Sequence, residues 1–217
     1  MPPSAPSLPF DLIETMPFDP EDGVLRIEAH LARMKASAEV LGFAFDRHDA
    51  RNELQAATFR LRRPATVRLL AARTGRIAIE IGPAPTPYTA PLDVALAPLP
   101  VPPGDSRLRH KSSARAFLDR ARLATRADEV AFVGPDGLLA GGSFTTIFVA
   151  RGGSLVTPPL ARGPLPGILR AELIAQGRAT EGDLAPADLT EGFFVGNALH
   201  GLMPAVVTVA KSGQPPL

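Results

Sequence analysis

Prolines crowd the segment from Pro83 to Gly104 and surround a single apolar, strand-like run, Leu92 to Leu96. Because proline fixes φ and lacks a backbone donor, this density excludes a continuous helix. We interpret the segment as the join between two lobes of a 217-residue chain, which is long enough to bury a sizeable core. The expected division is an N-terminal α/β lobe over residues 1–104, including the join, and a C-terminal lobe over residues 105–217.

Helical and strand-like periodicities occur on both sides of the join, and they predict a mixed α and β fold with antiparallel sheets. Before the join we expect a hairpin opening at Phe10, helices over 26–41 and 50–61, the second capped by Asp49, and a hairpin of strands 66–72 and 76–81. After it we expect helices near 113–124 and 167–176, and strands at 129–133, 146–150, 154–157 and 193–195.

The charge balance and the absence of cysteine exclude several kinds of function. With 23 basic and 22 acidic residues, the chain has no overall field for binding a nucleic-acid backbone. Without cysteine there is no disulfide, thiolate nucleophile or cysteine metal site, and we expect no metal. No signal-like start and no apolar run of about 18 residues occurs, so we expect a cytoplasmic protein without membrane partners.

Only three lysines are available for amine chemistry: Lys35, Lys111 and Lys211. Lys111 lies between a strand-like segment and the start of a helix. A lysine so placed can be partly desolvated, which lowers its pKa and frees the amine for imine formation. Taken alone, the segment also fits an ordinary surface lysine.

Three further segments could bind an anion. Arg33 lies beside the apolar stripe of the first long helix, Gly167 precedes a helix whose first N–H groups lack partners, and Asn197 follows a buried strand. Each has an ordinary structural explanation when read alone: a solvated arginine, a capped helix and a tight turn.

Taken together and in order, the segments resemble class IV aminotransferases, and within that family they are most similar to 4-amino-4-deoxychorismate lyases. The resemblance covers roughly residues 9 to 205. It is carried by Phe10-Asp-Leu-Ile-Glu-Thr-Met16, His30-Leu-Ala-Arg-Met34, His110-Lys-Ser-Ser113 with Arg115, Asp136 to Phe148, Leu165-Pro-Gly-Ile-Leu-Arg170 and Gly196-Asn-Ala-Leu-His-Gly-Leu202.

The resemblance implies the two-lobed fold-type IV architecture of D-amino acid aminotransferases, a homodimer, an amino substrate, and pyridoxal 5′-phosphate held between the lobes. Lys111 would hold the cofactor as a Schiff base and later move the substrate's Cα proton. Arg33 and the backbone N–H groups of Ile168, Leu169 and Asn197 would bind its phosphate. Weaker candidates near the ring or the substrate are Thr15, Arg115 and His200.

The sequence departs from the family pattern at three positions. The glutamate that pairs with the pyridine nitrogen is replaced by Gly141, which weakens the electron sink unless Ser143, Thr145 or Thr146 supplies a hydrogen bond. The asparagine expected before Ile-Phe is Thr146, and an expected arginine is His200.

Three functions therefore remain open. The first is a lyase that converts 4-amino-4-deoxychorismate to 4-aminobenzoate and pyruvate, a step of folate synthesis. The second is an aminotransferase for branched-chain or D-amino acids. The third is a degenerate member of the fold that has lost catalysis.

Overall fold

The computed structural model describes residues 10–208, and its chain forms two compact units. The first unit ends at Pro85 but also includes His110–Arg115, and the second contains Thr86–Arg109 and the chain from Ala116 onward. This division differs from the expected boundary at residue 104, which assigned Lys111 to the C-terminal lobe. The physical reason is backbone pairing, since Ser112 forms an antiparallel bridge with Leu12 in the first unit.

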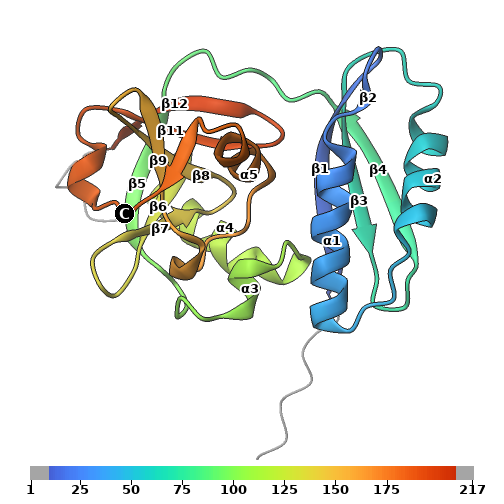
Figure 1. Cartoon of the computed structure of the whole chain (residues 1–217), viewed down its shortest axis with the longest axis horizontal. Coiled ribbons are helices and arrows are strands. Elements are labelled where there is room, and N and C mark those ends of the chain that lie inside the picture. Colours follow the sequence, from blue (N-terminus) through green and yellow to red (C-terminus); the bar gives the residue numbers. More distant parts are fainter. Residues whose placement is uncertain (1–9, 209–217) are drawn as a thin grey trace, which may run out of the picture. The chain divides into compact units, whose positions relative to one another are not determined.

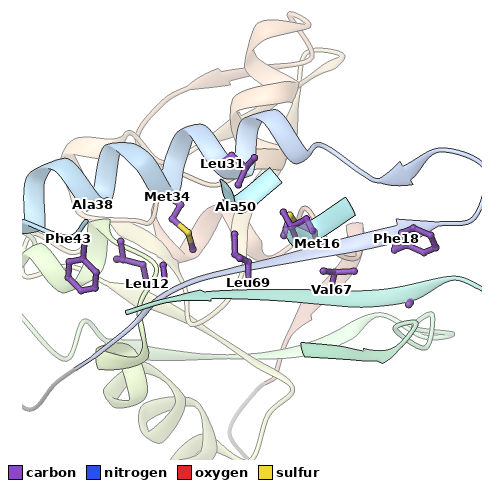
Figure 2. Packing of buried hydrophobic residues seen from close by; sticks show 13 residues of the cluster. Leu12, Met16, Phe18, Leu31, Met34, Ala38, Phe43, Ala50, Val67 and Leu69 are labelled. Carbon is purple, nitrogen blue, oxygen red and sulfur yellow. The ribbon is translucent and has the colours of Figure 1, made fainter. Parts of the chain in front are cut away.

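The first unit is a four-stranded antiparallel sheet with strand order β2-β1-β3-β4 and two helices (Figure 1). Figure 2 shows side chains of α1, such as Leu31 and Met34, directed toward those of β1 and β3, such as Leu69. The elements are β1 (Leu12–Asp19), β2 (Gly23–Val24), α1 (Ile27–Leu41), α2 (Arg47–Thr58), β3 (Ala65–Ala71) and β4 (Ile77–Pro83).

Both hairpins and the first helix of this unit are confirmed, but the start of the second helix was predicted wrongly. Helix α2 begins at Arg47, and its cap is Asp46, whose carboxylate accepts hydrogen bonds from the N–H groups of His48 and Asp49. Asp49 is therefore in the first turn of the helix. Both aspartates are good caps in the sequence, and the periodic apolar positions begin too late to choose between them.

The second unit contains an eight-stranded sheet with strand order β10-β9-β8-β11-β12-β5-β6-β7. Its strands are β5 (Leu92–Pro98), β6 (Glu129–Val133), β7 (Leu139–Gly142), β8 (Thr146–Arg151), β9 (Ser154–Thr157), β10 (Ala179–Glu181), β11 (Phe193–Asn197) and β12 (Gly201–Val207). Its helices are α3 (Ser106–Arg109), α4 (Ala116–Thr125) and α5 (Ile168–Ala175). The predicted strands 129–133 and 154–157 are confirmed, whereas β7, β10 and β12 were missed because they are short or contain glycine and proline.

The prediction of antiparallel sheets is only partly right for this unit, because its sheet is mixed: β6–β7, β8–β9, β8–β11 and β11–β12 are antiparallel, but other pairs are not. β5 pairs in parallel with β6 and with β12, and β9 pairs in parallel with β10. Helix α4 lies between β5 and β6 in the chain, and α5 lies between β9 and β10. A helical crossover returns the chain in the same direction, which makes the paired strands parallel.

Helix α5 packs against the sheet through a small apolar cluster. Leu169 and Leu173 of α5 contact Phe148 of β8 and Ala179 of β10 in this cluster. The packing fixes the first turn of α5 beside the strands that carry the Asn197 turn. No helix within residues 10–208 is both long and apolar enough to cross a membrane.

Candidate active site

The backbone around Lys111 is tied to the start of β1 in the first unit. The N–H of Ile13 donates to the carbonyl oxygen of Lys111 at 2.9 Å, and the N–H of Ser113 donates to Asp11 at 2.9 Å. The N–H of Asp11 in turn donates to Ser113 Oγ at 3.0 Å. These bonds fix where the Lys111 side chain starts, although the residue belongs to a segment nearly 100 positions away in sequence.

Glu14 is a buried carboxylate on the face of β1 that packs against α1, and the sequence analysis did not single it out. Only 1% of it is exposed, and it accepts hydrogen bonds from Arg33 Nε at 2.8 Å and Nη2 at 2.6 Å, while His30 Nδ1 lies 2.7 Å away. Burial alone would raise the pKa of Glu14, but the Arg33 charge and these hydrogen bonds lower it to about 2. Glu14 is therefore ionised at neutral pH and orients Arg33.

The alternation of side chains between the two faces of β1 could have identified Glu14 from the sequence. Leu12, Glu14 and Met16 share one face of the strand, and both neighbours are core residues. A carboxylate at such a position needs partners, because an uncompensated buried charge is costly.

Lys111 is half-buried among charged side chains, and its amine has a lowered pKa, as the sequence suggested. Burial lowers the pKa of Lys111 from 10.5 to about 8; Glu14 opposes this shift, and the Arg33 charge adds to it. Roughly one tenth of the amine is thus neutral at pH 7. The charges of Lys111 and Arg33 therefore interact within the first unit.

Thr15 and Arg115, the weaker candidates, belong to the same unit as Lys111. The charge of Arg115 lowers the pKa of Lys111, and so does that of Arg68 on β3, which lies directly opposite Thr15 in the sheet register. Arg68 was missed because a single arginine in an alternating strand is ordinarily a solvated one. Its position across from Thr15 is fixed only by strand pairing.

The backbone N–H groups expected to bind a phosphate, those of Ile168, Leu169 and Asn197, belong to the second unit, whereas Arg33 belongs to the first. Gly167 is the N-cap of α5 and provides no side-chain hydrogen bond, so the N–H groups of Ile168 and Leu169, at the first helical positions, have no intrahelical acceptor. Space favours Gly167: a Cβ there would lie 3.0 Å from Thr146 Oγ1, so this hydroxyl would have to shift. Pro166 precedes the cap and lies outside the helix.

The Asn197 turn adjoins the start of α5. Asn197 Oδ1 accepts hydrogen bonds from the N–H groups of Leu199 at 3.0 Å and His200 at 2.9 Å, which closes the turn. A Cβ on Gly196 would lie 2.9 Å from the Leu169 side chain, so the backbone and the helix approach closely. Burial lowers the pKa of His200, and its ring lies 5.5 Å from that of Tyr88.

Three hydroxyls could replace the missing glutamate at Gly141 by bonding to the ring nitrogen, but those of Ser143 and Thr145 already donate to another group. Ser143 Oγ donates to Glu129 at 2.6 Å and Thr145 Oγ1 donates to it at 2.7 Å, so neither proton is available to a ring nitrogen. A Cβ on Gly141 would lie 3.2 Å from the Cβ of Pro164. Glu129 was also missed, because a glutamate at the first position of a strand is usually exposed.

The lowered pKa of Lys111 predicts how its reactivity depends on pH. The rate of imine formation with an aldehyde probe should rise about tenfold per pH unit up to pH 8 and level off above it, because only the neutral amine attacks. The rate can be followed by rapid-mixing absorbance between pH 6 and pH 10, with Lys111→Met as the blank. A rate that keeps rising to pH 10 would show an ordinary lysine.

Comparison with known proteins places these features in a family. The model of the amino-transferase class IV family matches residues 11–207. A protein of Schizosaccharomyces pombe provisionally named aminodeoxychorismate lyase is 27% identical over 184 residues, covering 80% of this chain and 77% of the relative.

Solved structures agree with this match. A Mesorhizobium loti protein provisionally named an amino-acid aminotransferase is 38% identical, with a TM-score of 0.85 over 92% of this chain and 100% of that chain. A hypothetical aminotransferase from Mycobacterium tuberculosis, solved with α-ketoglutarate and PMP, shares the fold at 22% identity, with a TM-score of 0.81 over 100% of this chain and 90% of that chain. The architecture is thus that of the fold-type IV enzymes, and the chain belongs to the class IV aminotransferases.

Proposed function

We propose that the chain is a pyridoxal-phosphate-dependent lyase that converts 4-amino-4-deoxychorismate to 4-aminobenzoate and pyruvate, a step of folate synthesis. The observation that carries the proposal is Lys111, whose pKa is about 8 beside Arg33 in a chain of the class IV family. A lysine whose pKa lies only about one unit above neutral pH keeps part of its amine neutral there, which suits it to imine chemistry.

The residues fit the proposed cofactor. A phosphate ester needs backbone donors without side chains in the way, and the capless start of α5 with Gly167 provides them at Ile168 and Leu169. Asn197 ends the neighbouring strand, and Arg33 would add a guanidinium. The aldehyde carbon of the cofactor needs an amine, which Lys111 would supply.

Side chains of the protein would then transfer the protons and hold the charged groups in place. Bound pyridoxal phosphate supplies the electron sink. Lys111 Nζ, once exchanged for the substrate's amine, would take the proton from the substrate's Cα. Glu14 would keep Arg33 oriented while the amine changes charge, since its carboxylate holds both Nε and Nη2. Arg68, Arg115, Thr15 and His200 are candidates for contacts with the substrate.

Gly141 favours a lyase over a transaminase. A glutamate at that position would keep the ring nitrogen protonated, and its absence weakens the electron sink. Elimination from 4-amino-4-deoxychorismate creates an aromatic ring, which adds driving force that transamination lacks. The relative from Schizosaccharomyces pombe, provisionally named a lyase, supports the same choice.

The second candidate is transamination of a branched-chain or D-amino acid. It is supported by the 38% identity to the Mesorhizobium loti protein provisionally named an amino-acid aminotransferase. Both candidates need Lys111 and the same cofactor, so the products distinguish them.

The cofactor-loaded chain is expected to release pyruvate and 4-aminobenzoate in equal amounts from 4-amino-4-deoxychorismate, with no 2-oxo acid acceptor present. Chromatography measures the aromatic product, and a coupled dehydrogenase assay measures pyruvate. In a second assay with a branched-chain or D-amino acid as substrate, product that forms only when a 2-oxo acid is added would instead identify a transaminase. Absence of product in both assays, with the cofactor bound, would leave the degenerate member as the explanation.

A further inference from the structure

Glu129 is a second buried carboxylate, in the other unit from Glu14, and none of the proposed catalytic steps uses it. It begins β6, its side chain is fully buried, and none of the ion pairs formed within residues 10–208 includes it. A buried carboxylate without a cation must be stabilised by hydrogen-bond donors. The positions of these donors indicate what Glu129 does.

The donors come almost entirely from one turn between β7 and β8. Glu129 Oε1 accepts from the N–H of Ser143 at 3.0 Å and from its Oγ at 2.6 Å, and also from the N–H of Val130 at 2.7 Å. Oε2 accepts from the N–H of Phe144 at 3.2 Å and from Thr145 Oγ1 at 2.7 Å. The turn therefore wraps around the carboxylate.

The turn permits no larger residue at its first position. A Cβ on Gly142 would lie 2.5 Å from Thr145 Oγ1 and 2.8 Å from Glu129 Oε2. Because real Cβ atoms do not approach so closely, the glycine is needed for the chain to close around Glu129. The carboxylate and the 142–145 turn are thus held in one fixed arrangement.

The same turn contacts both candidate phosphate-binding elements. The carbonyl oxygen of Phe144 accepts a hydrogen bond from Asn197 Nδ2 at 3.4 Å. Thr146, which follows the turn, directs Oγ1 against Gly167 at the start of α5. A shift of the turn would therefore move the Asn197 turn and the α5 start relative to each other.

We infer that Glu129 is a positioning residue for a phosphomonoester: by holding the 142–145 turn, it sets the spacing between the Asn197 turn and the first N–H groups of α5. This inference rests on the proposed function, because it assigns the phosphate of the cofactor to these groups. Donors that bind an anion must be held to within a fraction of an ångström, and buried hydrogen-bond partners are the usual means. Glu129 does this without touching the ligand.

The test compares pyridoxal phosphate with pyridoxal, which lacks the phosphate. Both dissociation constants are measured on the intact chain by absorbance titration. In the unaltered chain, pyridoxal phosphate should bind more tightly than pyridoxal. Glu129→Gln, which cannot accept all of these hydrogen bonds, should reduce that preference by about tenfold or more while leaving pyridoxal binding nearly unchanged.

Two matched variants separate positioning from loss of stability. Thr145→Val removes one donor to Glu129 and should reduce the preference in the same direction, whereas Thr145→Ser keeps the hydroxyl and should restore it. Val94→Ala, in the buried core of the same unit, destabilises the chain without touching the turn and should leave the preference intact.

The possible results distinguish a positioning role of Glu129 from a purely structural one. Equal weakening of both ligands by Glu129→Gln, or an equal loss of preference in Val94→Ala, would overturn the positioning role. An unchanged preference in Glu129→Gln would do the same while the proposed function stands. Failure of the unaltered chain to bind pyridoxal phosphate would reject the proposed function itself, and the assignment of Glu129 with it.

Discussion

The Lys111→Ala variant is expected to lose the visible absorption band that pyridoxal phosphate forms with the unaltered chain, and turnover should fall by at least about 10³-fold. Lys111 supplies both the amine that binds the aldehyde and the group that moves the Cα proton, so one substitution removes two functions. An absorbance spectrum at saturating cofactor and a product assay measure the two losses.

Lys35→Ala is the matched control, because Lys35 is an exposed lysine that pairs with Glu39 at 3.8 Å. It should leave both the band and the turnover unchanged. Lys111→Arg keeps a cation but cannot form an imine, so it should also lose the band. A band that survives in Lys111→Ala would disprove the role of this lysine.

Glu14→Gln is expected to lower the free energy of unfolding by about 3 kcal/mol at pH 7. Arg33 and His30 are packed around the carboxylate, and removing its charge breaks the ion pair that Glu14 forms with the largely buried Arg33 guanidinium. Chemical denaturation followed by circular dichroism measures the change. Glu80→Gln, which breaks an exposed pair with Arg68, should cost no more than about 1 kcal/mol.

The cost of Glu14→Gln should also depend on pH. The folded-state pKa of Glu14 is about 2, below its ordinary value of 4.5, so the carboxylate's contribution is fully present above pH 4.5 and is lost as the pH falls toward 2. The unaltered chain and the variant should therefore converge in stability near pH 2. A difference that stays constant from pH 7 to pH 3 would contradict the lowered pKa of Glu14.

The same substitution tests the electrostatic link to Lys111. Glu14 raises the pKa of Lys111 and so opposes the effect of burial. In Glu14→Gln the plateau of imine formation should begin below pH 8. This shift separates an electrostatic role of Glu14 from a purely structural one.

Local patterns in the sequence were enough to predict most of the helices and strands, and they singled out Lys111 as a candidate. Apolar spacing predicted α1 and the β3–β4 hairpin, because the spacing of apolar residues within one segment shows which face of that helix or strand is buried. Lys111 was singled out because the sequence has only three lysines, and Gly167 because a helix start after glycine is a local signal.

Tertiary structure decided what depends on partners distant in sequence. Strand pairing joined the Lys111 segment to β1 and made β5 parallel to its neighbours, and neither register nor direction is encoded in one strand's pattern. The two buried carboxylates, Glu14 and Glu129, were missed for the same reason. Whether a glutamate is solvated or buried depends on donors such as Arg33, 19 residues away, or Ser143, 14 residues away, and only folding brings these to it.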